Sequence, residues 1–171
     1  MEEAGCHQIM YGIESADEGI LKNINKRVSL EQANKATALT KKAKIDVRLT
    51  FMLGSPGETE ETMQRTIRYA IKSDPDLIVF NITTPYPGTE MFKWAKEKGY
   101  LRTFDWTKYD LATVVMELPT VDSRTIEKYY KNAHKKFYLR PVYIAKRIAR
   151  VKSLIDLGMN LRFFARATLK Q

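Results

Sequence analysis

A strand that leads through a glycine and proline turn into an amphipathic helix is the feature that most constrains this fold. Residues 47–53 are mostly apolar, which is typical of a largely buried strand. Gly54, Pro56 and Gly57 then predict a tight turn, because glycine allows positive φ and proline fixes φ near about −65°. Thr59 is expected to cap the following helix. The turn therefore lies at the carboxyl end of a strand, where parallel α/β folds bind ligands.

Two further strand-loop-helix units flank this stretch. Three successive units predict an α/β fold with parallel strands, right-handed crossovers and all strand-end loops on one edge. The predicted strands are residues 7–13, 47–53 and 77–83, and the predicted helices begin at Ser15, Ser29, Thr59 and Thr89. Ser15 with Glu18, and Ser29 with Gln32, have the spacing of a capping box. Residues 112–118 are expected to form a fourth, peripheral strand, and the chain reads as helical after Pro119.

Positive charge is concentrated in the last part of the chain. The 171 residues carry a net charge of +9, and residues 135–171 supply all of it with ten Lys or Arg and one acid, Asp156. Apolar and basic residues mixed on short helices suit an anionic membrane surface, whereas cations alone would also bind nucleic acid. The plainest interpretation is that the apolar stripe packs on the rest of the protein. Packing is favoured, membrane contact is second, and nucleic acid is third.

The composition argues against several other classes of protein. Cys6 is the only cysteine, which excludes an internal disulfide and a cysteine-ligated metal cluster built from this chain alone. His7 and His134 have no ligand spacing, so no metal site is assigned. No apolar run approaches the roughly 20 residues that span a bilayer, and the acidic residues 1–4 do not resemble a signal peptide. A cytoplasmic protein is expected, peripheral to a membrane if residues 135–171 bind lipid.

Three motifs, in this order, resemble those of a known family. They are GCHQIMYGIES from Gly5, FMLGSPGETEET from Phe51 and ITTPYPGTE from Ile82. Together they resemble radical S-adenosylmethionine enzymes of the subgroup with cobalamin-binding domains, which includes anaerobic magnesium-protoporphyrin ester cyclases and cobalamin-dependent methyltransferases. The resemblance covers about residues 3–100. It implies the C-terminal half of a partial (β/α) barrel over residues 1–119, followed by a basic helical extension over residues 120–171.

The resemblance also implies a set of cofactor-binding residues. Glu14 would contact the ribose or methionine end of S-adenosylmethionine, although an ion pair with a nearby Lys or Arg is the structural alternative. Lys26 matches a cationic position of some relatives, but it reads more plainly as a surface lysine. Thr50 matches a ribose-contacting position, and Arg48 would reach the methionine carboxylate or the substrate. The remaining members of the set are Gly12 beside Glu14 and the turn residues Gly54, Pro56 and Gly57, which would lie next to the adenine.

One departure from the family pattern limits what this chain could do alone. The family holds a 4Fe-4S cluster with a C-x-x-x-C-x-x-C motif that this sequence lacks. The cluster, and cobalamin if it is used, would belong to a missing N-terminal half or a partner chain. The parent enzyme would generate a 5′-deoxyadenosyl radical for hydrogen abstraction during oxidative cyclisation or methylation of a small organic substrate, with tetrapyrroles and lipids as candidates. The alternative is a non-catalytic nucleotide-binding or interaction half-barrel that docks on a partner chain.

Overall fold

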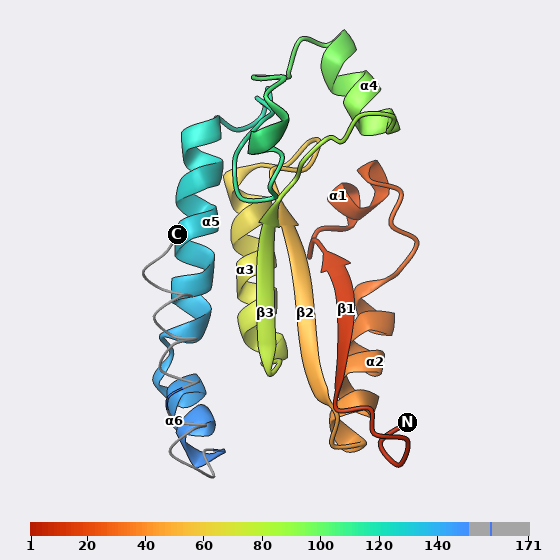
Figure 1. The fold of residues 1–171 in the computed structure, drawn as a ribbon, viewed down its shortest axis with the longest axis vertical. Coiled ribbons are helices and arrows are strands. Elements are labelled where there is room, and N and C mark those ends of the chain that lie inside the picture. The colour runs from red at the N-terminus through yellow and green to blue at the C-terminus, as the bar shows by residue number, and fades with distance from the viewer. Residues whose placement is uncertain (151–157, 159–171) are drawn as a thin grey trace. The chain divides into compact units, whose positions relative to one another are not determined.

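A computed structural model describes residues 1–150 and Gly158 (Figure 1). The elements follow in the order β1 (Gln8–Glu14), α1 (Glu18–Asn23), α2 (Leu30–Lys42), β2 (Asp46–Leu53), α3 (Glu60–Ser73), β3 (Leu77–Ile82), α4 (Glu90–Glu97), a 3₁₀ turn (Trp106–Lys108), α5 (Ser123–Tyr138) and α6 (Pro141–Ala149). The chain divides into two compact units, Met1–Tyr130 and Lys131–Gln171. Most of the predicted basic segment after residue 150 lies outside the described residues.

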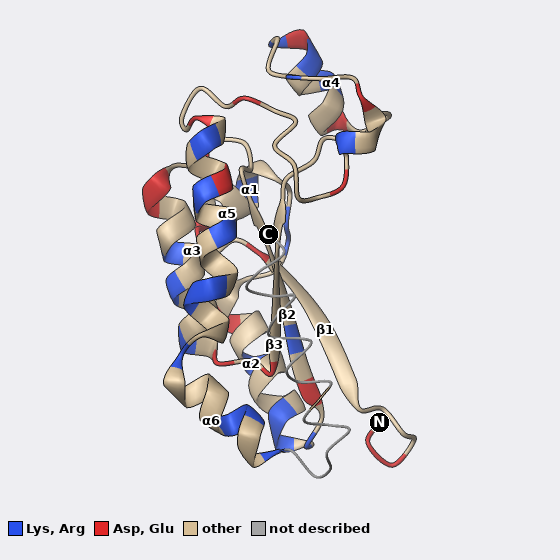
Figure 2. Ribbon diagram, turned by 60° about the vertical axis from the view of Figure 1, so that its left-hand side comes forward, with Lys and Arg blue, Asp and Glu red and all other residues tan. Residues whose placement is uncertain are grey.

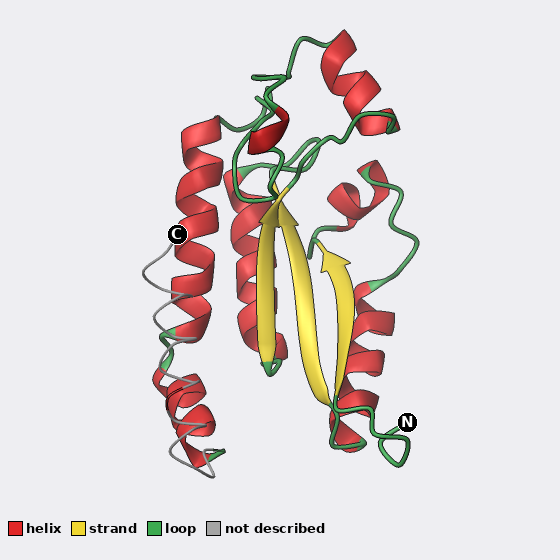
Figure 3. Cartoon of the chain, in the orientation of Figure 1, coloured by secondary structure: helices red, strands yellow, loops and turns green. Residues whose placement is uncertain are grey.

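The first unit is built on a three-stranded parallel sheet in the order β1-β2-β3, which confirms the predicted α/β class. All three arrowheads point to one edge, where the strand-end loops gather (Figure 3). Helix α2 packs against β1 and β2, and α3 packs against β2. Figure 2 shows both helices on the same side of the sheet. The structure therefore has the layering of a partial barrel.

Strand β2 has one fully buried face and one half-buried face. Its helix-side residues are all 0% exposed: Val47, Leu49, Phe51 and Leu53. The alternating residues between them are half-buried and include Arg48 and Thr50. Because paired residues of a sheet place their side chains on the same face, the register Gly12↔Thr50↔Val79 assigns these positions to one surface. We call this surface, opposite α2 and α3, the open face.

The helix caps match the sequence prediction at three of the four expected positions. Ser29 and Gln32 form the predicted capping box, and Thr59 and Thr89 cap their helices. The prediction for Ser15 is wrong, because Asp17 is the N-cap of α1 and accepts from the N–H of Ile20. The buried hydroxyl of Ser15 instead lies 3.3 Å from that of Thr66 and accepts from the N–H of the N-cap residue Asp17 at 3.1 Å.

The predicted peripheral strand at residues 112–118 is also wrong. Residues of this segment form only isolated bridges, Leu101↔Met116 and Leu118↔Val121. The carboxylate of Asp110 accepts from the N–H groups of Ala112 and Thr113, and this local turn prevents extension.

In the second unit the described residues are helical, as predicted. Pro141 is the first residue of α6, where its missing N–H costs nothing. Phe137, Tyr138 and Tyr143 are buried, and the guanidinium of Arg140 lies 4.3 Å from the centre of the Phe137 ring. Ile148, an apolar residue of the same helix, is 62% exposed. No helix in the described part of the chain is long and apolar enough to cross a membrane.

Candidate functional site

Glu14, at the carboxyl end of β1, turns its side chain back over the open face. Its backbone is left-handed, with φ of 67°, and the register of β1 against β2 shifts between Gly12 and Glu14. A Cβ at Gly12 would lie only 2.5 Å from Oε1 of Glu14. The carboxylate therefore occupies the space above Gly12, and a side chain at that position would displace it. Because Gly12 pairs with Thr50, the carboxylate lies on the same face of the sheet as Thr50.

Lys26, from the loop between α1 and α2, forms an ion pair with Glu14. Its Nζ lies 3.1 Å from Oε1, and the two side chains are 29% and 23% exposed. The pair is thus the structural alternative expected for Glu14. Within the part of the chain that the structure describes, Oε2 has no hydrogen-bond partner, so one carboxylate oxygen remains able to accept from a ligand.

Arg48 is a further charged side chain on the open face. Its Nε is buried and has no hydrogen-bond partner among the described residues. A buried guanidinium N–H without an acceptor is unusual, because leaving it unpaired costs free energy. Arg48 and Thr50 are two residues apart on β2 and therefore share a face. Four of the predicted site residues, Gly12, Glu14, Arg48 and Thr50, are thus brought onto one surface.

The predicted turn residues, Gly54, Pro56 and Gly57, follow β2 and are packed by protein groups. Gly54 has φ of 82°, and a Cβ there would lie 3.2 Å from Ile126 of α5. Gly57 has φ of 84°, and a Cβ there would lie 2.7 Å from the side-chain nitrogen of Asn23. That nitrogen donates to the carbonyl of Pro56 at 2.9 Å. A role of the turn in ligand contact would therefore belong to its peptide groups.

Glu58 is a site residue that the sequence reasoning missed. It is 0% exposed, and its Oε2 accepts from the N–H groups of Gly54 at 2.6 Å and Ser55 at 2.9 Å. Burial raises the pKa of Glu58 to about 7, although the two backbone hydrogen bonds oppose the rise and nearby Asp17 adds to it. Its only sequence signal is an acid directly before the N-cap Thr59, a position that is usually solvated. Glu58 fixes the shape of the turn from inside.

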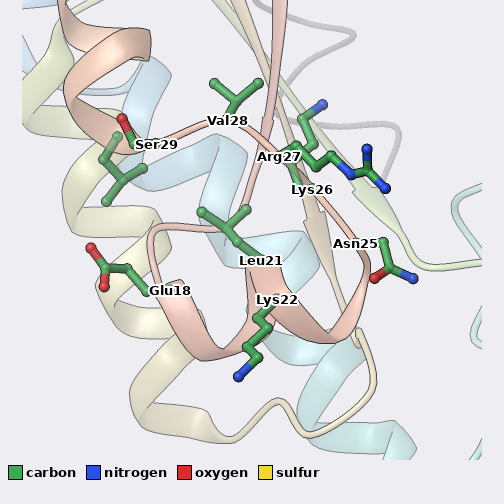
Figure 4. Close-up of a pocket in the computed structure, with 9 residues that line it drawn as sticks. Glu18, Leu21, Lys22, Asn25, Lys26, Arg27, Val28 and Ser29 are labelled. Atoms are coloured by element: carbon green, nitrogen blue, oxygen red, sulfur yellow. The ribbon is translucent and has the colours of Figure 1, made fainter.

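A pocket of about 370 Å³ lies beside Lys26, between α1 and α2 (Figure 4). Leu21 and Val28 form part of its apolar wall, and three cations line it: Lys22, Lys26 and Arg27. Figure 4 shows that Lys22 points away from the other two. The cations do not converge on one point, so the pocket has no evident anion site.

The residues of this chain do not fit a 4Fe-4S cluster. Cys6 is half-buried, and its thiol points to the carbonyl of Gln8 at 3.7 Å. The described residues contain no group of three or more His, Cys, Asp or Glu able to hold a metal. A 4Fe-4S cluster needs several cysteine thiolates, and the sequence has one. The open face, by contrast, offers a carboxylate, a guanidinium and a hydroxyl, which suit the hydroxyl, ammonium and carboxylate groups of S-adenosylmethionine.

A parallel α/β unit with its strand-end loops on one edge is typical of the partial-barrel class, in which ligands usually bind at that edge. Comparison with known proteins makes the assignment more specific. Residues 1–70 match the family model described as the Radical SAM superfamily. An uncharacterised methyltransferase of Pyrococcus horikoshii is 39% identical over 148 residues, which cover 86% of this chain and 32% of the relative.

Two other relatives have more specific names. The anaerobic magnesium-protoporphyrin IX monomethyl ester cyclase of Cereibacter sphaeroides is 28% identical over 81% of this chain and 22% of its own length. The bacteriochlorophyllide d C-8(2)-methyltransferase of Chlorobaculum tepidum is 24% identical over 94% of this chain and 36% of its own length. The resemblance to radical SAM methyltransferases and cyclase-like enzymes is thus confirmed. The chain spans about a third or less of the length of these relatives.

Proposed function

We propose that this chain forms part of the S-adenosylmethionine-binding wall of a radical SAM enzyme that methylates or oxidatively cyclises an organic substrate. The observation that carries the proposal is the Glu14 carboxylate folded over Gly12, on the same face as Thr50 and Arg48. The match of residues 1–70 to the Radical SAM superfamily supports it independently.

Each side chain on the open face has a distinct part in this proposal. Glu14 would accept hydrogen bonds from a ribose hydroxyl or the methionine ammonium through Oε2, while Lys26 holds Oε1. Arg48 would donate its unpaired Nε–H to a carboxylate, which removes the cost of leaving that group buried without an acceptor. Thr50 would hydrogen-bond the ribose. S-adenosylmethionine, when bound, supplies the radical chemistry, and the protein supplies binding and orientation.

The proposal assigns the 4Fe-4S cluster to another segment or to a partner chain, because the residues here do not fit it. Cobalamin, if the enzyme uses it, would likewise be held elsewhere. The names of the relatives suggest the kind of substrate. They refer to a magnesium-protoporphyrin ester and a bacteriochlorophyllide. A further relative, 29% identical over 70% of this chain and 22% of its own length, is named as a hopanoid C-3 methylase of Methylococcus capsulatus. All three names refer to ring compounds. A tetrapyrrole or lipid-like ring substrate is therefore proposed.

Calorimetric titration with S-adenosylmethionine tests the proposal. Glu14→Gln should weaken binding by roughly 1–2 kcal/mol, because it removes charge-assisted hydrogen bonds. Glu31→Gln, an exposed acid in the first turn of α2, is the matched control and should bind as the wild type does. Equal affinity in the wild type and Glu14→Gln, or no binding to the wild type, would contradict the proposal.

A second candidate function is a non-catalytic interaction module that docks on another chain. The observation that favours it is the open face itself, where Met10 is 60% exposed and pairs in register with Arg48. Parallel sheets are normally covered on both faces, so such a surface is a natural docking site. Light scattering separates the candidates: a module of this kind should associate with itself or a partner, yet show no affinity for S-adenosylmethionine.

A further inference from the structure

A groove is lined by residues of α1, α4 and the turn after β2. Figure 1 shows α1 and α4 beyond the carboxyl edge of the sheet. Its volume is about 560 Å³, within the range of about 300–1,000 Å³ that is usual for small-molecule sites. Three separate segments line it: Asn23, Ile24 and Asn25 at the end of α1, Pro56 and Gly57 in the turn, and Glu90, Met91 and Trp94 on α4. None of the four open-face residues is among them. The groove thus shares no residue with the open face, although its Pro56 and Gly57 belong to the turn that the resemblance places next to the adenine.

The groove has a fixed aromatic wall. The ring of Trp94 meets the edge of Tyr100 at a centroid distance of 5.2 Å, and neighbouring Ala95 is 0% exposed. These contacts hold the half-buried indole in place, so that a ligand need not order it. Ile24 and Met91 provide further apolar surface. A rigid indole between flexible aliphatic side chains suits a flat ring, which can lie against the aromatic face or edge.

The side of the groove formed by Asn23 and the Pro56–Gly57 turn is also held by specific contacts. Asn23 donates to the carbonyl of Pro56 at 2.9 Å, which ties α1 to the turn. A Cβ at Gly57 would lie 2.7 Å from the same amide nitrogen, so only glycine permits this contact. The positive φ of Gly57 requires glycine independently. The end of α1 and the turn are thus held together by contacts that do not involve the open face.

The negative charge of Glu90 should favour some ring ligands over others in this groove. Among the described residues that line it, Glu90 is the only ionisable one. Its exposed carboxylate would attract a cation and repel an anion, and a cation over an indole gains further attraction from the aromatic face. The amide of Asn25 can also accept from an N–H group. An anionic ring would meet neither a Lys nor an Arg of the lining set.

We propose that this groove is a second ligand site, which binds a planar ring system carrying a positively charged or N–H-donating nitrogen. The proposal goes beyond S-adenosylmethionine binding and does not depend on it. Trp94 would form the wall, Glu90 would select the nitrogen, and the Pro56–Gly57 turn would form the floor.

Tryptophan fluorescence tests this site directly, because the chain has only two tryptophans, Trp94 and Trp106. In Trp106→Phe, Trp94 is the sole reporter, and 9-aminoacridine, a flat tricyclic cation, should quench it saturably. Acridine-9-carboxylate, the anionic counterpart, should bind at least about five-fold more weakly. Glu90→Gln in the same background should weaken the cation by roughly three- to five-fold and leave the anion unchanged or tighter.

Two controls make the result specific. Glu97→Gln removes an exposed acid at the other end of α4, outside the groove, and should leave both affinities unchanged. In Trp94→Phe, the remaining Trp106 reports on the neighbouring aromatic cluster with Phe104, whose ring lies 6.3 Å away. Quenching confined to Trp106, the absence of saturable quenching of Trp94, or equal affinities for the two probes would overturn the proposal. So would a Glu90→Gln variant that folds normally and binds the cation as before.

Discussion

The buried carboxylate of Glu58 accepts the backbone N–H of Gly54 at 2.6 Å, and this contact closes the turn that follows β2. The second oxygen, Oε1, is buried without a hydrogen-bond partner among the described residues. The Glu58 carboxylate thus holds the turn together, but its burial also costs free energy. The balance between these two effects depends on its protonation.

The raised pKa of Glu58 predicts that stability falls as pH rises. The folded protein holds the proton up to a pKa of about 7, whereas the unfolded chain releases it near the ordinary value of 4.5. Between these values the folded state binds more protons, so the free energy of unfolding should fall by up to about 3 kcal/mol. Glu58→Gln, which is neutral at every pH, should remove this part of the dependence. Urea unfolding of both proteins at several pH values from 4.5 to 8 measures this pH dependence. Parallel pH profiles of the wild type and Glu58→Gln would refute the prediction.

Replacing Gly54 should have a steric effect that a comparison with Gly88 can separate from backbone strain. Gly54→Ala combines a strained φ of 82° with a contact of 3.2 Å to Ile126, and should destabilise the protein by about 1–3 kcal/mol. Gly88→Ala is the matched control, because Gly88 has φ of 86° but nothing within 4 Å of its Cβ position. It should cost only the backbone strain, about 1 kcal/mol.

The steric part of the Gly54→Ala effect can also be checked by compensation. Ile126→Val in the Gly54→Ala background should recover part of the loss, since it shortens the side chain that the new methyl group meets. Thermal unfolding of the single and double variants gives the coupling. Equal losses in Gly54→Ala and Gly88→Ala would show that Ile126 yields without cost.

The elements and caps of this fold could be predicted because their causes are local. Ser29, Thr59 and Thr89 cap their helices through side-chain contacts three residues away, which sequence spacing displays. The strand at residues 47–53 follows from its apolar run. The prediction for Ser15 was wrong because Asp17 caps the helix, while the Ser15 hydroxyl accepts from the N–H of Asp17 and lies against Thr66, 51 residues away. Such a tertiary contact leaves no mark in the local pattern.

The sequence predicted which residues belong to the candidate site, but not how these residues are arranged. The motifs drew attention to Gly12 and Glu14, yet the reason for the glycine is a close approach that only coordinates reveal. The burial of Glu58 could not be foreseen, because an acid beside an N-cap is usually exposed. Residues 112–118 have the β propensity of a strand, but Asp110 turns the chain before they can extend.

The single cysteine predicts that this chain holds no stoichiometric 4Fe-4S cluster by itself. After anaerobic reconstitution with iron and sulfide, the absorption and electron paramagnetic resonance spectra of the monomer should lack such a cluster, because one thiolate cannot satisfy the irons. Cys6→Ser is the control and should give the same spectra. A full cluster signal in the wild type would overturn the assignment of the cluster to another segment or chain.

The last prediction concerns lipid binding by the basic C-terminal part. Around α6 three apolar side chains are exposed: Leu139 at 51%, Val142 at 63% and Ile148 at 62%. Helix α6 has no acid in its first turn and carries Lys146 and Arg147 in its last. Exposed apolar groups among cations suit the surface of an anionic bilayer, where each cation contributes up to about 1 kcal/mol.

Flotation on vesicles tests this surface. The chain should float with vesicles that contain phosphatidylserine and remain behind with phosphatidylcholine alone, and high salt should weaken the association. Val142→Glu and Ile148→Glu should each reduce flotation. Leu39→Glu is the matched control, because Leu39 on α2 is 58% exposed but lies in the first unit.

If nucleic acid were the partner instead, the Glu variants would bind duplex DNA only slightly less well, since phosphate contact needs the cations and not the apolar groups. Equal flotation of the wild type and both Glu variants, or none with anionic vesicles, would end the membrane proposal.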